Sequence, residues 1–212
     1  MLGLGSSLYK AGKVGKSIIR DGLVLKHGYN AGAVEPVSSG AAAFDASSDN
    51  FVDVGTIPIT DNDVSLSAWV NIPSWVNYAA IITNRGGDDN QGLQIRIADG
   101  SQKFELFIDE GASGTTKNLP SSTLNSNQWY HVCGVFDRDG FMSLYINGVL
   151  DGTPVNISAT ADSLTHSTSV KIGKTGSTGI DGYICNVGYW NRVLDQDDVK
   201  SIMHKDYAAL SA

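Results

Sequence analysis

Hydrophobic and polar residues alternate with a period of two along several short stretches of the chain. Apolar residues occupy the even positions from Val64 to Ile72. Because successive side chains of a strand point to opposite faces, this pattern predicts a strand with one face in a core. Residues 93–97 and 103–109 show the same alternation, and Asp99-Gly100 between them predicts a hairpin turn.

A different pattern covers residues 129–136, which are apolar at both parities and therefore favour a central strand buried on both faces. Asn147-Gly148 suits a two-residue turn whose central positions need positive φ. Further strands are predicted on either side of this turn and near the C-terminus, over residues 142–146, 149–150, 170–173 and 182–190.

One helix is expected, over residues 196–203. Asp195 can cap it, and Asp198 lies three residues later, as in a capping box. Because strands and helices do not alternate elsewhere, a parallel α/β fold is not expected. The sequence predicts an all-β fold with one short C-terminal helix.

The first 40 residues differ from the rest. Residues 1–20 are rich in Gly, Ser and Lys, and neither the strand period of two residues nor the helical period of about 3.6 residues persists in them. We therefore expect an N-terminal arm over 1–40 and one domain over 41–212. Residues 1–30 carry five basic residues and one acidic residue, a net of +4, whereas the remainder carries ten basic and 21 acidic residues, a net of −11. An acidic body repels phosphate backbones, so no nucleic-acid partner is expected.

The arm places apolar residues among basic ones. Such a segment has too little apolar surface to fold alone, so it either stays disordered or orders against a partner. The candidate partner-binding residues are Leu8, Tyr9, Lys10, Ile18, Ile19, Arg20, Leu23 and Leu25.

Glycines and lysines interrupt the N-terminal region before any apolar run reaches signal-peptide length, and no segment reaches transmembrane length. We expect synthesis in a cytoplasm and no membrane partner. Cys133 and Cys185 fall in predicted strands without metal-ligand spacing. Free buried thiols are favoured, and a disulfide between them stays open.

Catalytic residues are not expected. The glutamates are Glu35, Glu105 and Glu110, and none belongs to the alternating carboxylate pair that a sandwich glycosidase carries on one strand. The chain has no Gly-x-Ser-x-Gly elbow, and its four histidines form no recognisable constellation. The sequence therefore predicts a binding protein without a cofactor.

Five segments, in order, carry a family resemblance. They are 43–52, 64–70, 127–132, 144–148 and 182–194. Together they resemble the laminin-G-like, concanavalin A-like jelly-roll superfamily over about residues 41–207. The resemblance implies a two-sheet antiparallel jelly-roll sandwich whose edge loops often bind calcium, sugars or protein partners. Trp69 and Trp129 are large enough to span the space between the two sheets, and we expect them there.

The N-terminal part carries a second resemblance. Residues 3–8, 21–27 and 37–44 are similar to the openings of laminin-G-like structural proteins of marine bacteriophages. This similarity implies a virion protein, such as a capsid decoration (cement) protein or an appendage. Its partners would be the major capsid protein or neighbouring virion subunits, with self-association also open.

The alternative hypothesis is a lectin-like module that attaches to a surface glycan. Its candidate edge loops are residues 74–78, 86–91 and 173–180. Within the first loop, Trp75 and Tyr78 are the candidates to stack on a sugar ring.

Calcium assistance stays open in this alternative. Asp45 and Asp49 match acidic positions of relatives, but Cys185 and Asn186 stand where relatives carry an acidic pair, which leaves Asp181 as the nearest carboxylate. Calcium takes six to eight oxygen ligands, and a thiol is a poor substitute. No metal ligand is therefore assigned.

Overall fold

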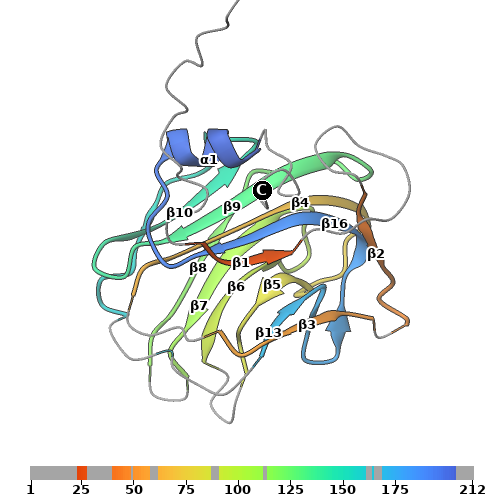
Figure 1. Cartoon of the computed structure of the whole chain (residues 1–212), viewed down its shortest axis with the longest axis horizontal. Coiled ribbons are helices and arrows are strands. Elements are labelled where there is room, and N and C mark those ends of the chain that lie inside the picture. Colours follow the sequence, from red (N-terminus) through yellow and green to blue (C-terminus); the bar gives the residue numbers. More distant parts are fainter. Residues whose placement is uncertain are drawn as a thin grey trace, which may run out of the picture.

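Two antiparallel sheets face each other in the computed structural model, as Figure 1 shows. It describes residues 23–27, 40–48, 50–57, 62–86, 91–111, 114–160, 164 and 169–203. This architecture confirms the jelly-roll sandwich and its single C-terminal helix.

The eight-stranded sheet is centred on three long strands. Its order is β1 (Leu23–His27), β16 (Asp181–Trp190), β4 (Val64–Ser74), β9 (Trp129–Phe136), β10 (Phe141–Ile146) and β11 (Val149–Leu150). Two short strands attach to it: β2 (Ala42–Phe44) pairs with β16, and β12 (Val155–Asn156) pairs with β10.

The six-stranded sheet forms the opposite layer. Its order is β3 (Val52–Gly55), β13 (Val170–Ile172), β5 (Ala80–Thr83), β6 (Gly92–Ile97), β7 (Phe104–Asp109) and β8 (Thr116–Pro120). A small hairpin of β14 (Lys174–Thr175) and β15 (Thr178–Gly179) follows β13. The predicted hairpin at Asp99-Gly100 is confirmed, since β6 and β7 pair in register.

The core lies between the sheets and uses alternate positions of each strand. Leu66 and Val70 of β4 face Ile95 and Leu106 in one buried cluster. At Gly134 of β9 the sheets pack tightly, because a Cβ there would lie 2.4 Å from a Leu106 methyl group. The period-two pattern of the sequence therefore identifies the inner face correctly.

The predicted positions of the two tryptophans are wrong. Trp69 lies at an odd position of β4, whereas the even positions fill the space between the sheets. Its indole N–H donates to the Met203 carbonyl at 3.2 Å, and its ring packs edge-on against His131, with centroids 5.5 Å apart. Trp129 has the same parity as His131, so it too lies on the outer side.

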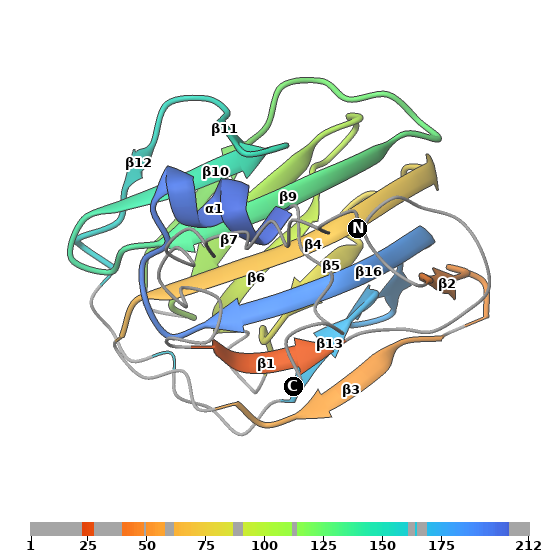
Figure 2. The ribbon, with the colours of Figure 1, turned by 45° about the horizontal axis from the view of Figure 1, so that its top comes forward.

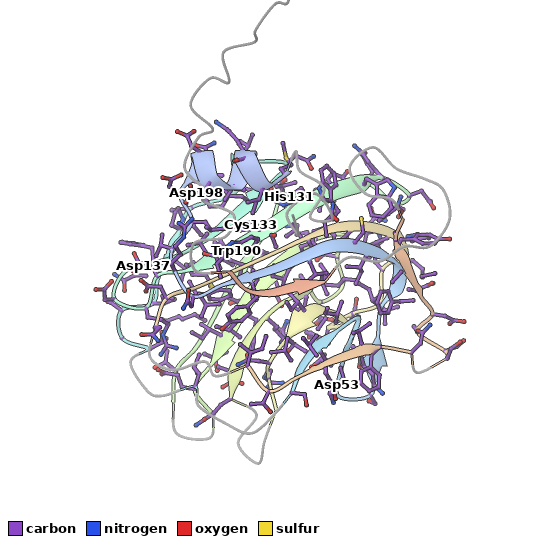
Figure 3. The ribbon with its side chains drawn as sticks, viewed as in Figure 1. Asp53, His131, Cys133, Asp137, Trp190 and Asp198 are labelled. Carbon is purple, nitrogen blue, oxygen red and sulfur yellow. The ribbon has the colours of Figure 1, made fainter. Side chains whose placement is uncertain are left out.

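The outer side of β9 is covered by the helix α1 (Gln196–Met203), which explains why β9 is apolar at both parities. Figure 2 shows α1 lying across β9 and β10. Cys133 and Trp190 are buried there with the helix residues Val199 and Ile202 (Figure 3). Both cysteines are buried and neither is in a disulfide, and burial raises the pKa of the Cys133 thiol, so this thiol is a poor nucleophile.

The helix begins as the sequence predicts. The Asp198 backbone N–H donates to Asp195 Oδ1 at 2.8 Å, and the Asp195 N–H donates back to Asp198 Oδ2 at 3.4 Å. The predicted turn at Asn147-Gly148 is also confirmed, with φ of 51° and 76°.

The predicted arm needs a correction at residues 23–27. Residues 23–27 form β1, which pairs antiparallel with β16 at the edge of the eight-stranded sheet (Figure 1). Leu23 and Leu25 therefore lie in a strand of the sandwich, because a β-pattern run beside an open sheet edge can complete its backbone hydrogen bonds there. Residues 1–22, with Leu8, Tyr9, Lys10, Ile18, Ile19 and Arg20, lie outside the described residues.

Candidate functional site

Polar side chains gather on the outer face of the six-stranded sheet. On β6, Leu93, Ile95 and Ile97 enter the core, so Gln94 and Arg96 point to the opposite face. The pairing of the strands extends this face sideways. Gln94 lies opposite Thr83 of β5 and Phe107 of β7, and Thr83 lies opposite Lys171 of β13.

A pocket of about 500 Å³ opens on this outer face, and we call it the sheet pocket. It lies between β6 and the β14–β15 hairpin. Its lining residues are Tyr78, Arg85, Gly86, Gln94, Arg96, Lys171, Thr175, Gly176, Ser177 and Thr178.

Gln94 is fully buried, and within the described part of the chain neither its amide nitrogen nor its amide oxygen has a hydrogen-bond partner. A buried polar group without a partner costs about 1–3 kcal/mol of folding free energy. Native proteins pair the large majority of such groups, so an orphaned amide in a pocket wall needs a reason. A ligand that bonds to it would supply one.

Arg96 is held rigidly beside Gln94. Its Nε donates to Glu105 Oε1 at 2.6 Å, and Glu105 also accepts a hydrogen bond from Asn118 at 3.1 Å. The guanidinium carbon lies 3.8 Å from the centre of the Phe107 ring and 5.0 Å from that of Tyr78. Ion pairing and stacking together fix the plane of this cation.

Two further cations border the sheet pocket. Arg85 bonds to Asp109 Oδ2 through Nη2 at 2.9 Å and through Nε at 3.3 Å. The Lys171 ammonium lies 5.2 Å from the centre of the Phe51 ring and has no carboxylate partner within the described residues. Among the described residues, the lining contains three cationic side chains and no carboxylate.

Tyr78 forms the exposed rim of the pocket, with 43% of its surface accessible. Its φ of 64° is in the left-handed region, which is strained for a bulky residue and recurs at functional sites. A hydrogen bond to the Asp99 carboxylate raises the pKa of the Tyr78 phenol. The same bond orients the ring.

The three predicted edge loops meet at this pocket. Loop 74–78 supplies Tyr78, loop 86–91 supplies Gly86, and loop 173–180 supplies Thr175 to Thr178. Trp75 does not line it. Its ring packs against Phe104 in the core, with centroids 5.3 Å apart, and its indole N–H donates to Ser126 at 2.9 Å, so burial and hydrogen bonding explain this residue.

Four lining residues were not predicted: Arg85, Gln94, Arg96 and Lys171. The sequence does indicate that two of them share a face, because Gln94 and Arg96 occupy the polar positions of a predicted strand. Their convergence with Lys171 depends on β13 pairing with β5, which connects segments far apart in the sequence.

Of the carboxylates considered for calcium, Asp45 and Asp181 adjoin a pair of neighbouring strand residues, Phe44 of β2 and Gly182 of β16. Asp45 accepts hydrogen bonds from the backbone and hydroxyl groups of its own turn, at Ser47 and Ser48, and these bonds lower its pKa. Asp49 lies outside the described residues, and Asp181 is in β16.

Within the described ranges, one group of acidic side chains has oxygens close enough to hold a cation. Asp63, Asp137 and Asp139 place one carboxylate oxygen each within 4.8 Å of the others. The backbone N–H of Arg138 donates to Asp63, so part of this charge is satisfied internally.

A family profile matches most of the chain. The concanavalin A-like lectin/glucanases superfamily (Laminin_G_3) covers residues 45–200. The chain belongs to this family. No curated protein matches the sequence.

Solved structures support the same fold. The binding domain of Paraclostridial Mosquitocidal Protein 1 aligns with a TM-score of 0.63 and 15% identity, over 86% of this chain and 52% of that one. The heptameric SAP-like pentraxin of Limulus polyphemus aligns with a TM-score of 0.60 and 16% identity, over 76% of this chain and 80% of that one.

A third structure is the ligand-binding domain of botulinum neurotoxin serotype D in complex with N-acetylneuraminic acid. It aligns with a TM-score of 0.55 and 21% identity, over 72% of this chain and 39% of that one. This chain spans about half the length of the mosquitocidal protein domain and less of the neurotoxin domain. Among the residues with described structure, no helix is long and apolar enough to cross a membrane.

Proposed function

We propose that this chain is a non-enzymatic carbohydrate-binding domain that receives a sugar in the sheet pocket. The observation that carries the proposal is the polar lining of the sheet pocket, in whose wall the Gln94 amide is buried with both polar atoms unpaired among the described residues. An amide offers a donor and an acceptor side by side, which matches the paired hydroxyl groups of a sugar ring.

The rest of the lining suits the same ligand. The exposed ring of Tyr78 presents an apolar face on which the C–H side of a sugar can stack, and Thr175, Ser177 and Thr178 add residues with hydroxyl side chains. A concave site with few converging polar groups is the usual form of a small-ligand pocket. The lectin-type family supports this reading, as does the sugar bound by the neurotoxin domain.

The proposal includes neither catalysis nor calcium. Glycoside hydrolysis needs two carboxyl groups at the scissile bond, and the described lining of the pocket contains none. Calcium needs several oxygen ligands of that kind. Sugar binding is therefore expected to persist in the presence of a chelator.

Binding of the purified chain to an immobilised panel of neutral and acidic oligosaccharides tests the proposal. Tyr78→Asn removes the ring but keeps a residue that tolerates left-handed φ. We expect roughly tenfold weaker binding, since aromatic contacts of this kind are worth about 1 kcal/mol or more. Phe141→Asn, at an exposed aromatic residue of β10 in the other sheet, is the matched control and should bind as wild type.

Two results would contradict the proposal. One is a panel on which no oligosaccharide binds. The other is equal loss of binding in Tyr78→Asn and Phe141→Asn, because the bound sugar would then not depend on the sheet pocket.

The virion role and virion location stay predictions. They depend on the resemblance of the N-terminal segment, most of which lies outside the described residues. A carbohydrate-binding sandwich is compatible with them, since an attachment protein on a particle needs a module of this kind.

A further inference from the structure

We infer that the sugar bound by the sheet pocket carries a negative charge, as a carboxylate or a sulfate group. This inference rests on the proposed function and adds the chemical class of the ligand. It rests on the cationic side chains of the described lining, whose sign is opposite to the net charge of the whole chain.

The chain has a net charge of −7, with 22 acidic and 15 basic residues. The described lining of the sheet pocket nevertheless contains Arg85, Arg96 and Lys171 and no acidic residue. Among the described carboxylates nearby, Glu105 and Asp109 are bonded to the arginines and Asp99 is bonded to Tyr78, and none of the three is in the described lining. An anion that approaches the pocket therefore meets cationic groups first.

The arginines retain donors for such an anion. Arg96 uses Nε for Glu105, and its two terminal amino groups have no hydrogen-bond partner in the described part of the chain. Arg85 uses Nε and Nη2 for Asp109, which leaves Nη1. Guanidinium groups in a fixed plane bind carboxylate and sulfate oxygens with directional, charge-assisted hydrogen bonds. Because Phe107 and Glu105 already hold Arg96, little entropy is lost when it binds.

Lys171 is the third cation of the described lining. It lies in the same row across the sheet as Gln94, with Thr83 between them. Its ammonium is held near the Phe51 ring and is not paired with a carboxylate within the described residues. A sugar that stacks on Tyr78 and bonds to Gln94 can direct an acidic substituent toward this cluster.

Matched pairs of oligosaccharides separate charge from shape. Oligogalacturonate and its methyl ester share a skeleton and differ in the carboxylate, and dextran sulfate oligosaccharides differ from dextran oligosaccharides in the sulfate. Isothermal titration of the whole chain should show binding at least roughly tenfold tighter for the charged member of one pair, weakening at high salt. The pair that responds identifies the acidic group.

Lys171→Met keeps the alkyl chain beside Phe51 and removes the charge. We expect it to weaken binding of the charged oligosaccharide roughly tenfold and to leave any binding of the neutral one unchanged. Lys200→Met, on α1 of the opposite layer, makes the same change of net charge away from the pocket and should have no effect. Thermal melting of both variants checks that they fold.

The outcomes distinguish the two claims. Equal affinity for charged and neutral members, with binding still lost in Tyr78→Asn, overturns the inference and leaves the proposed function intact. Equal effects of Lys171→Met and Lys200→Met also overturn it. Failure of every oligosaccharide to bind, here and on the panel, removes the proposed function itself.

Discussion

Gln94 shows how one residue can be unfavourable for folding and useful for binding. Its side chain lies in a fully buried position on β6, and no described residue gives it a hydrogen bond to offset the loss of water. Its strand neighbours Leu93 and Ile95 are buried and apolar, so the strand itself does not require an amide there. Residues of this kind occur at sites where function sets the side chain at a cost in stability.

Gln94→Leu should therefore stabilise the fold while weakening sugar binding. The change removes an unpaired buried amide and keeps a similar volume, so a gain of about 1 kcal/mol in the free energy of unfolding is expected. Urea denaturation measures it. Gln91→Leu is the control, because the Gln91 amide donates to the Glu110 carbonyl at 3.0 Å and its loss should be destabilising. A Gln94→Leu protein less stable than wild type would show that the amide has partners in the fold.

Asp137 gives a pH-dependent prediction. Burial, then a hydrogen bond with Asp139 and the charges of Asp63 and Asp139, raise the pKa of the Asp137 carboxyl above its ordinary value of 3.8. The folded state then holds this proton to higher pH than the unfolded chain does. The contribution of Asp137 to stability consequently falls as pH rises from 3.8 through the raised pKa.

Asp137→Asn removes that ionisation and should be more stable than wild type at neutral pH. The gain should disappear at about pH 3, where the carboxyl is protonated in both states. Thermal melts at the two pH values measure it, and Asp53→Asn on β3, on the other sheet, controls for net charge (Figure 3). A gain of the same size at both pH values would contradict the account.

Helix α1 covers part of the outer side of the eight-stranded sheet. Its buried residues Val199 and Ile202 close over Cys133 and Trp190, and its N-terminus is joined to β4 through Ser65. The Ser65 hydroxyl donates to the Arg192 carbonyl at 2.7 Å and accepts from the Leu194 N–H at 3.1 Å. The helix is therefore part of the sandwich and stabilises its outer layer.

Asp195→Ala should destabilise the chain by about 1 kcal/mol, because it removes the side-chain oxygen that accepts the Asp198 N–H. Asp197→Ala, in the same first turn but exposed, loses only a favourable position near the helix N-terminus and should cost about 0.5 kcal/mol or less. Chemical denaturation of both variants compares them. Equal losses would show that the capping bond contributes nothing beyond the charge.

The elements show what the sequence could predict. Strands with a clear period, such as β4 and β6, and the capped helix were expected at nearly their observed bounds. Strand β5 has four successive buried residues, and β8 is a largely exposed edge strand, so neither shows the alternation that identifies a strand. The covering of the outer positions of β4 could not be predicted, because Ser65 and Ser67 are polar residues of a kind that usually faces solvent, yet both are fully buried.

At the scale of the molecule, the sheet pocket depends on the topology more than on any motif. Lys171 and Gln94 lie 77 positions apart in the sequence and share one row only because β13 pairs with β5 and β5 with β6. The three edge loops could be predicted from turn residues, but the cations between them could not. Helix α1 lies over one sheet (Figure 2), and the other sheet carries the sheet pocket on its outer face.

Backbone amide NMR of the labelled chain, titrated with the tightest-binding oligosaccharide of the panel, tests the central claim most directly. The account predicts shift changes at Tyr78, Gln94, Arg96, Lys171 and the β14–β15 hairpin, with the strands under α1 unchanged. Saturable binding with changes confined to the eight-stranded sheet would contradict it.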